Sequence, residues 1–141
     1  MSTKKPYPEM QSLPDLVNET AVLSYLNTQS VNISSLDKLR ALAHVNDTVI
    51  ASWLNINVKT LRNYKTEDAK IKDYVQEKIV LLLSLFKHGM EVMGDSKIFS
   101  NWLETSNFFF DNKTPSDFLT TFSGILFVDE RLSAMEYGDN V

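Results

Sequence analysis

The sequence contains no cysteine. It therefore has no disulfide framework, no thiolate ligand for a metal ion and no cysteine nucleophile. This absence fits a reducing compartment, and we expect a cytoplasmic protein. The first ten residues contain two lysines but no apolar run behind them, so we expect no secretory signal there.

Glycine and histidine are also scarce. The four glycines, at positions 89, 94, 124 and 138, form no phosphate-binding or dinucleotide-binding loop, and no Gly-x-Ser-x-Gly motif occurs. His88 with Glu91 offers at most two metal ligands on one helix face, and nothing nearby completes a site. We therefore expect no metal, no cofactor, no small-molecule substrate and no enzymatic activity.

Long apolar runs are absent as well. The most apolar stretch, residues 79–86, is far shorter than the roughly 20 residues that cross a bilayer. Apolar residues nevertheless make up 43% of the 141 residues, which is enough for a hydrophobic core. No alternation typical of strands is present, so the sequence predicts an all-α protein without a membrane-spanning segment.

Helical spacing predicts the order of the elements. Residues 1–14 contain three of the four prolines and are expected to form a flexible arm. A first helix is expected at 16–27 with Asp15 as its N-cap, and a second at 36–45 after Ser34 or Ser35.

A long helix is expected at about 69–92, ending at Gly94. Its stretch at residues 79–86 is apolar nearly all round, more than a small domain is expected to cover. We therefore expect a homodimer, with Leu81 and Leu85 at or near the interface.

Residues 47–64 carry the pattern of a helix-turn-helix. Asn46 or Asp47 suits the first N-cap, Ala51 is small where two helices cross, and Asn55 suits a left-handed turn. Asn57 then caps a second helix whose inward residues are Leu61 and Tyr64. Such a second helix normally lies in the major groove of DNA. We expect DNA contacts from its outer residues, namely Asn57, Val58, Lys59, Arg62 and Asn63.

The C-terminal third is expected to form shorter helices. Ser96 is the expected cap of one that contains Trp102, and Thr114-Pro115 is the expected start of another. Trp102 and Phe110 are interpreted as core residues. The final helix has an apolar stripe and ends at Gly138, and its acids Asp129 and Glu130 are interpreted as solvated.

Charge is divided unevenly along the chain. Residues 34–78 contain eight Lys and Arg and six Asp and Glu, a net charge of +2. Residues 89–141 contain three Lys and Arg and nine Asp and Glu, a net charge of −6. The first segment tolerates a phosphate backbone, whereas the second should prefer a basic partner.

The C-terminal half resembles the toxin-binding domain of the Xre/MbcA/ParS antitoxin family. The residues that carry the resemblance are Gly94-Asp95, Trp102-Leu103, Asn107, Lys113-Thr114-Pro115, Leu119, Ser123-Gly124, Val128, Leu132 and Glu136-Tyr137-Gly138. Asp111-Asn112 replaces the glycine pair of the family pattern, and both residue types tolerate the same backbone. The helix-turn-helix falls where the Xre part belongs, so the resemblance extends from about residue 34 to the end.

This resemblance implies an antitoxin of a type II toxin–antitoxin system. Its implied partners are a RES-type toxin that consumes NAD⁺, operator DNA in its own promoter and a second copy of the chain. The expected parts are an N-terminal arm and first helix at 1–33, the helix-turn-helix unit at 34–68, and the long helix with the toxin-binding domain at 69–141.

The end of the chain is expected to block the toxin's active site. The residues concerned are Glu136, Tyr137, Gly138, Asp139, Asn140 and Val141. Their position at the end of the chain favours exposure, and their acidity suits a site that holds an anionic pyrophosphate. The alternative is a stand-alone dimeric transcriptional regulator whose C-terminal domain only dimerises.

Overall fold

The computed structural model describes residues 8–16, 18–66 and 70–138, and in them it shows an all-α fold. Three short 3₁₀ helices are η1 (Pro8–Ser12), η2 (Phe108–Phe110) and η3 (Pro115–Phe118). The α-helices are α1 (Glu19–Thr28), α2 (Ile33–Ala43), α3 (Asp47–Leu54), α4 (Val58–Thr66), α5 (Asp73–Met93), α6 (Ser96–Leu103) and α7 (Phe122–Glu136). The predicted fold class is confirmed.

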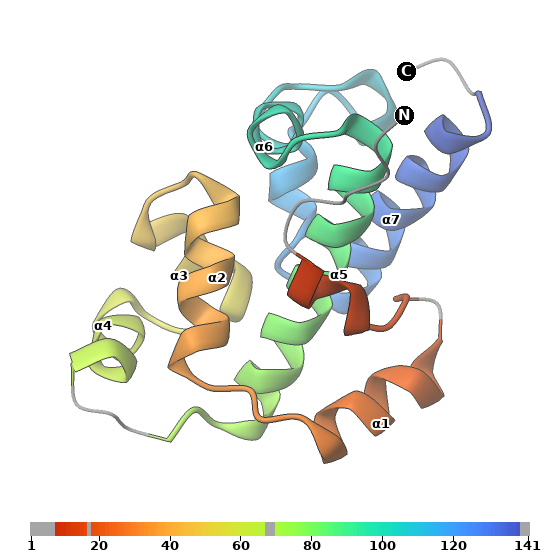
Figure 1. Ribbon diagram of the computed structural model, residues 1–141. Helices are drawn as coiled ribbons and strands as arrows, with labels where there is room; N and C mark the ends of the chain where they lie inside the picture. The colour runs from red at the N-terminus through yellow and green to blue at the C-terminus, as the bar shows by residue number, and fades with distance from the viewer. Residues whose placement is uncertain (1–7, 17, 67–69, 139–141) are drawn as a thin grey trace.

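Helix α5 is the centre of the molecule. It passes between α7 on one side and α2 and α3 on the other (Figure 1). All of residues 79–86 are buried, as expected for a helix that is apolar nearly all round. The helix begins later than the predicted residue 69, at Asp73. It ends as predicted, because Gly94 takes a left-handed φ of 88° and donates its N–H to the carbonyl of Met90.

The chain itself covers the second apolar face of α5. Leu81 and Leu85 are only 4% and 0% exposed. The argument that placed a dimer interface on these two residues was therefore wrong. Elements on every side of α5, including η1 and α1, supply the cover that a small domain was expected to lack.

The segment before α1 is not a free arm over its described part. Residues 8–12 form η1, and Met10 and Leu13 are buried against the core. Lys87 of α5 donates a 2.9 Å hydrogen bond from Nζ to the carbonyl oxygen of Leu13. The flexible arm predicted for residues 1–14 is thus corrected for residues 8–14, whose apolar side chains gain by covering α5. Residues 1–7 lie outside the described part.

Two helix starts also differ from the prediction. Asn18, rather than Asp15, caps α1 by accepting a hydrogen bond from the N–H of Ala21. Asn32 caps α2 with its side chain. The hydroxyl oxygen of Ser35, at the third helical position, in turn accepts a hydrogen bond from the backbone N–H of Asn32. Residues predicted as caps can therefore serve inside the first turn, because several neighbouring side chains can bond its free N–H groups.

The C-terminal third follows the predicted order with local corrections. Asp95 caps α6, and Ser96 is its first residue rather than its cap. Thr114 caps η3 as predicted, but that segment is only one short 3₁₀ turn, and α7 begins separately after Thr121. Asp111 and Asn112 adopt left-handed φ values of 56° and 61°, so they supply the backbone expected of the glycine pair that they replace.

Gly124 of α7 lies against the backbone of η3. A Cβ added there would overlap the backbone carbonyl oxygen of Phe118. Backbone cannot move aside as easily as the end of a flexible side chain. Glycine is therefore required at this position although it is a poor helix former.

We predict that Gly124→Ala lowers the free energy of unfolding by about 1–3 kcal/mol, because overpacking outweighs the gain in helix propensity. Urea unfolding followed by circular dichroism measures this loss. The exposed neighbour provides the control, since Ser123→Ala should change the value by less than about 0.5 kcal/mol. An alanine variant at 124 as stable as the unchanged chain would contradict the packing argument.

Candidate functional site

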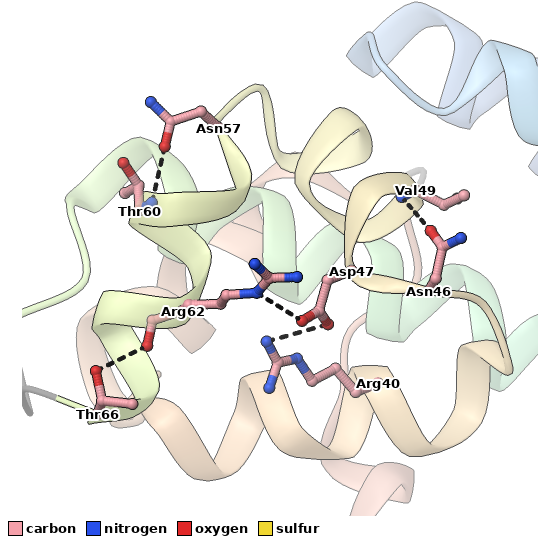
Figure 2. Close-up of polar contacts among 8 residues, drawn as sticks. All are labelled: Arg40, Asn46, Asp47, Val49, Asn57, Thr60, Arg62 and Thr66. Carbon is pink, nitrogen blue, oxygen red and sulfur yellow. Dashed lines mark hydrogen bonds and ion pairs between the residues drawn. The ribbon is translucent and has the colours of Figure 1, made fainter.

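Helices α3 and α4 form the predicted helix-turn-helix. The side chain of Asn46 accepts the N–H of Val49 and caps α3, and Asn55 ends it with a left-handed φ of 59°. Asn57 caps α4 by accepting a 2.8 Å hydrogen bond from the N–H of Thr60 (Figure 2). Ala51, Leu61 and Tyr64 are buried as predicted. Local capping thus defines where α3 begins and ends and where α4 begins.

The outer face of α4 contains fewer free side chains than predicted. Lys59 and Arg62 are exposed, and Asn63 is half-buried. Val58 packs against the hydrophobic core, and the side-chain oxygen of Asn57 is engaged in its cap. Lys59, Arg62 and Asn63 therefore form the face that remains available, with the helical spacing that one groove contact needs.

An ion-pair network lies behind this face. Asp47 forms ion pairs with two arginines. Its Oδ1 lies 3.2 Å from Nη2 of Arg40, and its Oδ2 lies 3.6 Å from Nε of Arg62. Figure 2 shows the two guanidinium groups approaching Asp47 from helices α2 and α4. The predicted base-reading residue Arg62 is thus held by an acid of the first turn of α3. The sequence did not reveal this contact, because it depends on the docking of three helices.

The end of α7 presents the described part of the predicted toxin-binding tail. Tyr137 is 89% exposed, and Gly138 is exposed with a left-handed φ of 90°. Glu136 is not free, because its Oε1 lies 2.9 Å from Nε2 of His88. Asp139, Asn140 and Val141 lie outside the described residues.

His88 is bound between two carboxylates, a cluster that sequence reasoning missed. Its Nδ1 lies 2.6 Å from Oδ1 of Asp129, and its Nε2 faces Glu136. Asp129 is only 6% exposed, so its interpretation as a solvated acid was wrong. A signal was present, because Asp129 falls between Ile125 and Leu132 on the buried stripe of α7.

These two carboxylates stabilise the imidazolium form of His88. The hydrogen bond to Asp129 is the largest cause, burial opposes it, and the bond to Glu136 adds to it; together they raise the pKa of His88 from 6.5 to about 9. His88 is therefore charged at neutral pH. It fixes the last turn of α7, from which the tail departs, to the central helix α5.

Aromatic side chains of this region divide into a core group and a surface group. Phe110 is buried as predicted, and Trp102 is partly buried, with its ring edge-to-face with that of Phe110 at 5.8 Å. Phe108 and Phe109, in contrast, are exposed, although they belong to the same 3₁₀ turn. The described residues contain no group of three or more His, Asp and Glu that could hold a metal ion.

Part of the chain matches a known protein family. Residues 88–138, from the C-terminal part of α5 to the turn after α7, match the family model for the antitoxin Xre/MbcA/ParS C-terminal toxin-binding domain. This part of the chain is therefore a toxin-binding module of a toxin–antitoxin system. Residues 88–138 thus carry the C-terminal domain of the Xre/MbcA/ParS antitoxin family. No curated protein sequence matches it. Among the described residues, no helix combines the length and apolar character needed to cross a bilayer.

We predict a pH-dependent cost for His88→Ala. A group whose folded pKa is raised stabilises the fold fully below its unfolded pKa, here 6.5, and loses that effect as the pH rises through about 9. At pH 6 the variant should lose about 1–3 kcal/mol, because Asp129 stays buried without its charged partner. Chemical denaturation at pH 6 and at pH 10 should show the difference from the unchanged chain shrinking at the higher pH.

Glu136→Gln provides a matched comparison, because it removes the charge of only the outer carboxylate. Its loss at pH 6 should be smaller than that of His88→Ala. A gap between His88→Ala and the unchanged chain that grows with pH would contradict the assigned charge state.

Proposed function

We propose that this antitoxin neutralises a RES-type toxin that consumes NAD⁺, and that its C-terminal tail blocks the toxin's active-site entrance. The toxin partner follows from the matched domain. The RES type is proposed from the sequence resemblance. The observation that carries the blocking role is the exposure of Tyr137 at the end of a helix whose last turn is fixed by His88.

Charge supports this role for the tail. Residues 129–141 contain Asp129, Glu130, Glu136 and Asp139 against Arg131, a net charge of −3. Because a site for NAD⁺ must hold an anionic pyrophosphate, it should be lined by Arg or Lys. His88 on α5 pairs with Asp129 and Glu136, so the part proposed to enter the cleft begins at Tyr137, and the acidic side chain that it contributes is Asp139. The Tyr137 ring suits stacking where a flat ring of the dinucleotide would lie.

The tail is tested by truncation after Glu136. This deletion removes residues 137–141 and keeps the contact between His88 and Glu136. We predict that the truncated chain folds and still binds the toxin, but no longer rescues cells that express it. Rescue is measured as colony formation at matched antitoxin levels. Full rescue by the truncated chain would overturn the blocking mechanism and leave the antitoxin assignment intact.

We also propose that the chain represses its own operon through α4. The support is a helix-turn-helix with Lys59 and Arg62 exposed on the outer face of its second helix. In Figure 1, α4 and α7 lie at opposite sides of the molecule with α5 between them. DNA and toxin would thus bind at separate ends. A homodimer remains the expected form for a palindromic operator, on a surface other than Leu81 and Leu85.

For DNA binding we predict a roughly 10-fold or greater loss of affinity in Lys59→Ala/Arg62→Ala, since a base-reading arginine contributes about 1–3 kcal/mol. Gel-shift titration of the operon's own promoter, at one fixed salt concentration, measures it. Lys97→Ala removes an exposed cation from α6 and should bind as the unchanged chain does. Unchanged affinity of the double variant would remove α4 as the DNA-contacting element.

The proposed role is cytoplasmic and requires no chemistry by the chain itself. Both partners are bound through surfaces, and the toxin's substrate is excluded by occupancy. The alternative, a stand-alone regulator, leaves the matched toxin-binding domain without a partner. Loss of the toxin phenotype when the chain is co-expressed with the neighbouring reading frame separates the two.

A further inference from the structure

Exposed apolar side chains concentrate in the toxin-binding domain. Eight large apolar side chains are exposed among the described residues, and six of them lie within residues 88–138. These six are Ile98, Phe108, Phe109, Phe122, Phe127 and Tyr137. Apolar patches that stay exposed in a folded chain commonly mark protein interaction sites.

Three of these six, together with one arginine, form a continuous surface. The rings of Phe108 and Phe109 meet edge to face with centroids 5.8 Å apart. The guanidinium carbon of Arg131 lies 3.8 Å from the centre of the Phe109 ring. Phe127 is one helical turn before Arg131 on α7, so both face the same side. We call Phe108, Phe109, Phe127 and Arg131 the aromatic face.

The aromatic face is held in place from below. The Phe127 ring packs edge to face on the buried ring of Phe110 at 5.2 Å, and also lies 5.6 Å from that of Phe118. Phe110 follows directly after Phe108 and Phe109 in the same turn. Both the turn that carries Phe108 and Phe109 and the ring of Phe127 are thus anchored to the buried ring of Phe110. The aromatic face therefore need not reorganise when a partner binds to it.

The loop that carries Phe108 is also fixed. Asn107 accepts the N–H of Asn112 at 3.0 Å on its backbone carbonyl, and its own N–H bonds the carbonyl of Lys113 at 3.0 Å. The side chain of Asn107 accepts the N–H of Phe109. The left-handed residues Asp111 and Asn112 close this loop. Phe108, at 81% exposure, is therefore held out by ordered backbone.

We propose that the aromatic face is the main docking surface for the toxin, and that the tail supplies inhibition rather than affinity. This inference rests on the proposed function, and it assigns most of the free energy of toxin binding to the aromatic face. Aromatic residues and arginine are enriched among the side chains that dominate interface energetics. The face lies wholly inside the matched toxin-binding domain. The proposal requires an apolar complementary surface on the toxin.

The test measures affinity by isothermal titration calorimetry between the full chain and the purified toxin encoded beside it. Phe108→Ser/Phe109→Ser is expected to weaken binding at least about 30-fold, the effect typical of central interface residues. Leu23→Ser removes an exposed apolar side chain from α1, outside the matched domain, and should leave the dissociation constant within about twofold.

Circular dichroism melts confirm that each variant folds. Because Phe108 is 81% exposed and Phe109 is 41% exposed, their replacement should lower the melting temperature only slightly, through the lost contact between Phe109 and Arg131. A folded double variant that binds the toxin as tightly as the unchanged chain would overturn the aromatic face as the docking surface. If the double variant unfolds, Phe108→Ser alone decides, with at least about 10-fold weaker binding expected.

The chain truncated after Glu136 separates this inference from the blocking mechanism. If both hold, the truncated chain binds with near-normal affinity and does not inhibit, whereas the double variant binds weakly. If the truncated chain alone loses affinity, the aromatic face is wrong while the tail remains the inhibitor. If the truncated chain still inhibits and the double variant binds weakly, the tail mechanism fails and the docking surface stands.

Discussion

Burial of α5 is the constraint on which the other elements depend. Eight consecutive residues of this helix, 79–86, are apolar or small, and each must be removed from water. The chain achieves this with its own segments: α7 and α6 cover one part, α2 and α3 another, and η1 with α1 the remainder. The same helix therefore joins the helix-turn-helix to the toxin-binding domain through one hydrophobic cluster.

The ends of this arrangement differ in charge and in the way their side chains are held. At the α4 end, Asp47 holds Arg40 and Arg62, so part of the positive charge is already engaged within the fold. At the α7 end, the charged His88 holds two carboxylates, one buried and one at the start of the tail. Each network orients a residue of a proposed binding site by an ion pair that joins separate helices, and each makes that orientation depend on the packing around α5.

Features set by neighbouring residues were predictable from the sequence. The left-handed residues Asn55, Asp111 and Asn112, the cap Asn57 and the helix end at Gly94 all follow from local backbone requirements. The all-α class followed from helical spacing, and the toxin-binding domain within residues 88–138 from a set of spaced residues.

Contacts between distant residues were not predictable in the same way. The pair His88 with Asp129 joins α5 to α7, Arg62 with Asp47 joins α4 to α3, and Arg131 over Phe109 joins α7 to η2. The error at Leu81 and Leu85 has the same origin, because the segments that cover them come from several parts of the chain. The spacing of apolar and polar residues along a helix predicts that a residue is buried, but it does not show which segment covers that residue.

The most direct test of the account is a titration of the purified cognate toxin, proposed to consume NAD⁺, with this chain while the rate of NAD⁺ consumption is followed. The account predicts that the rate falls in proportion to added antitoxin and reaches zero at a fixed molar ratio, because each bound chain closes a substrate entrance. A toxin rate that stays unchanged at a several-fold molar excess of the folded chain would contradict it.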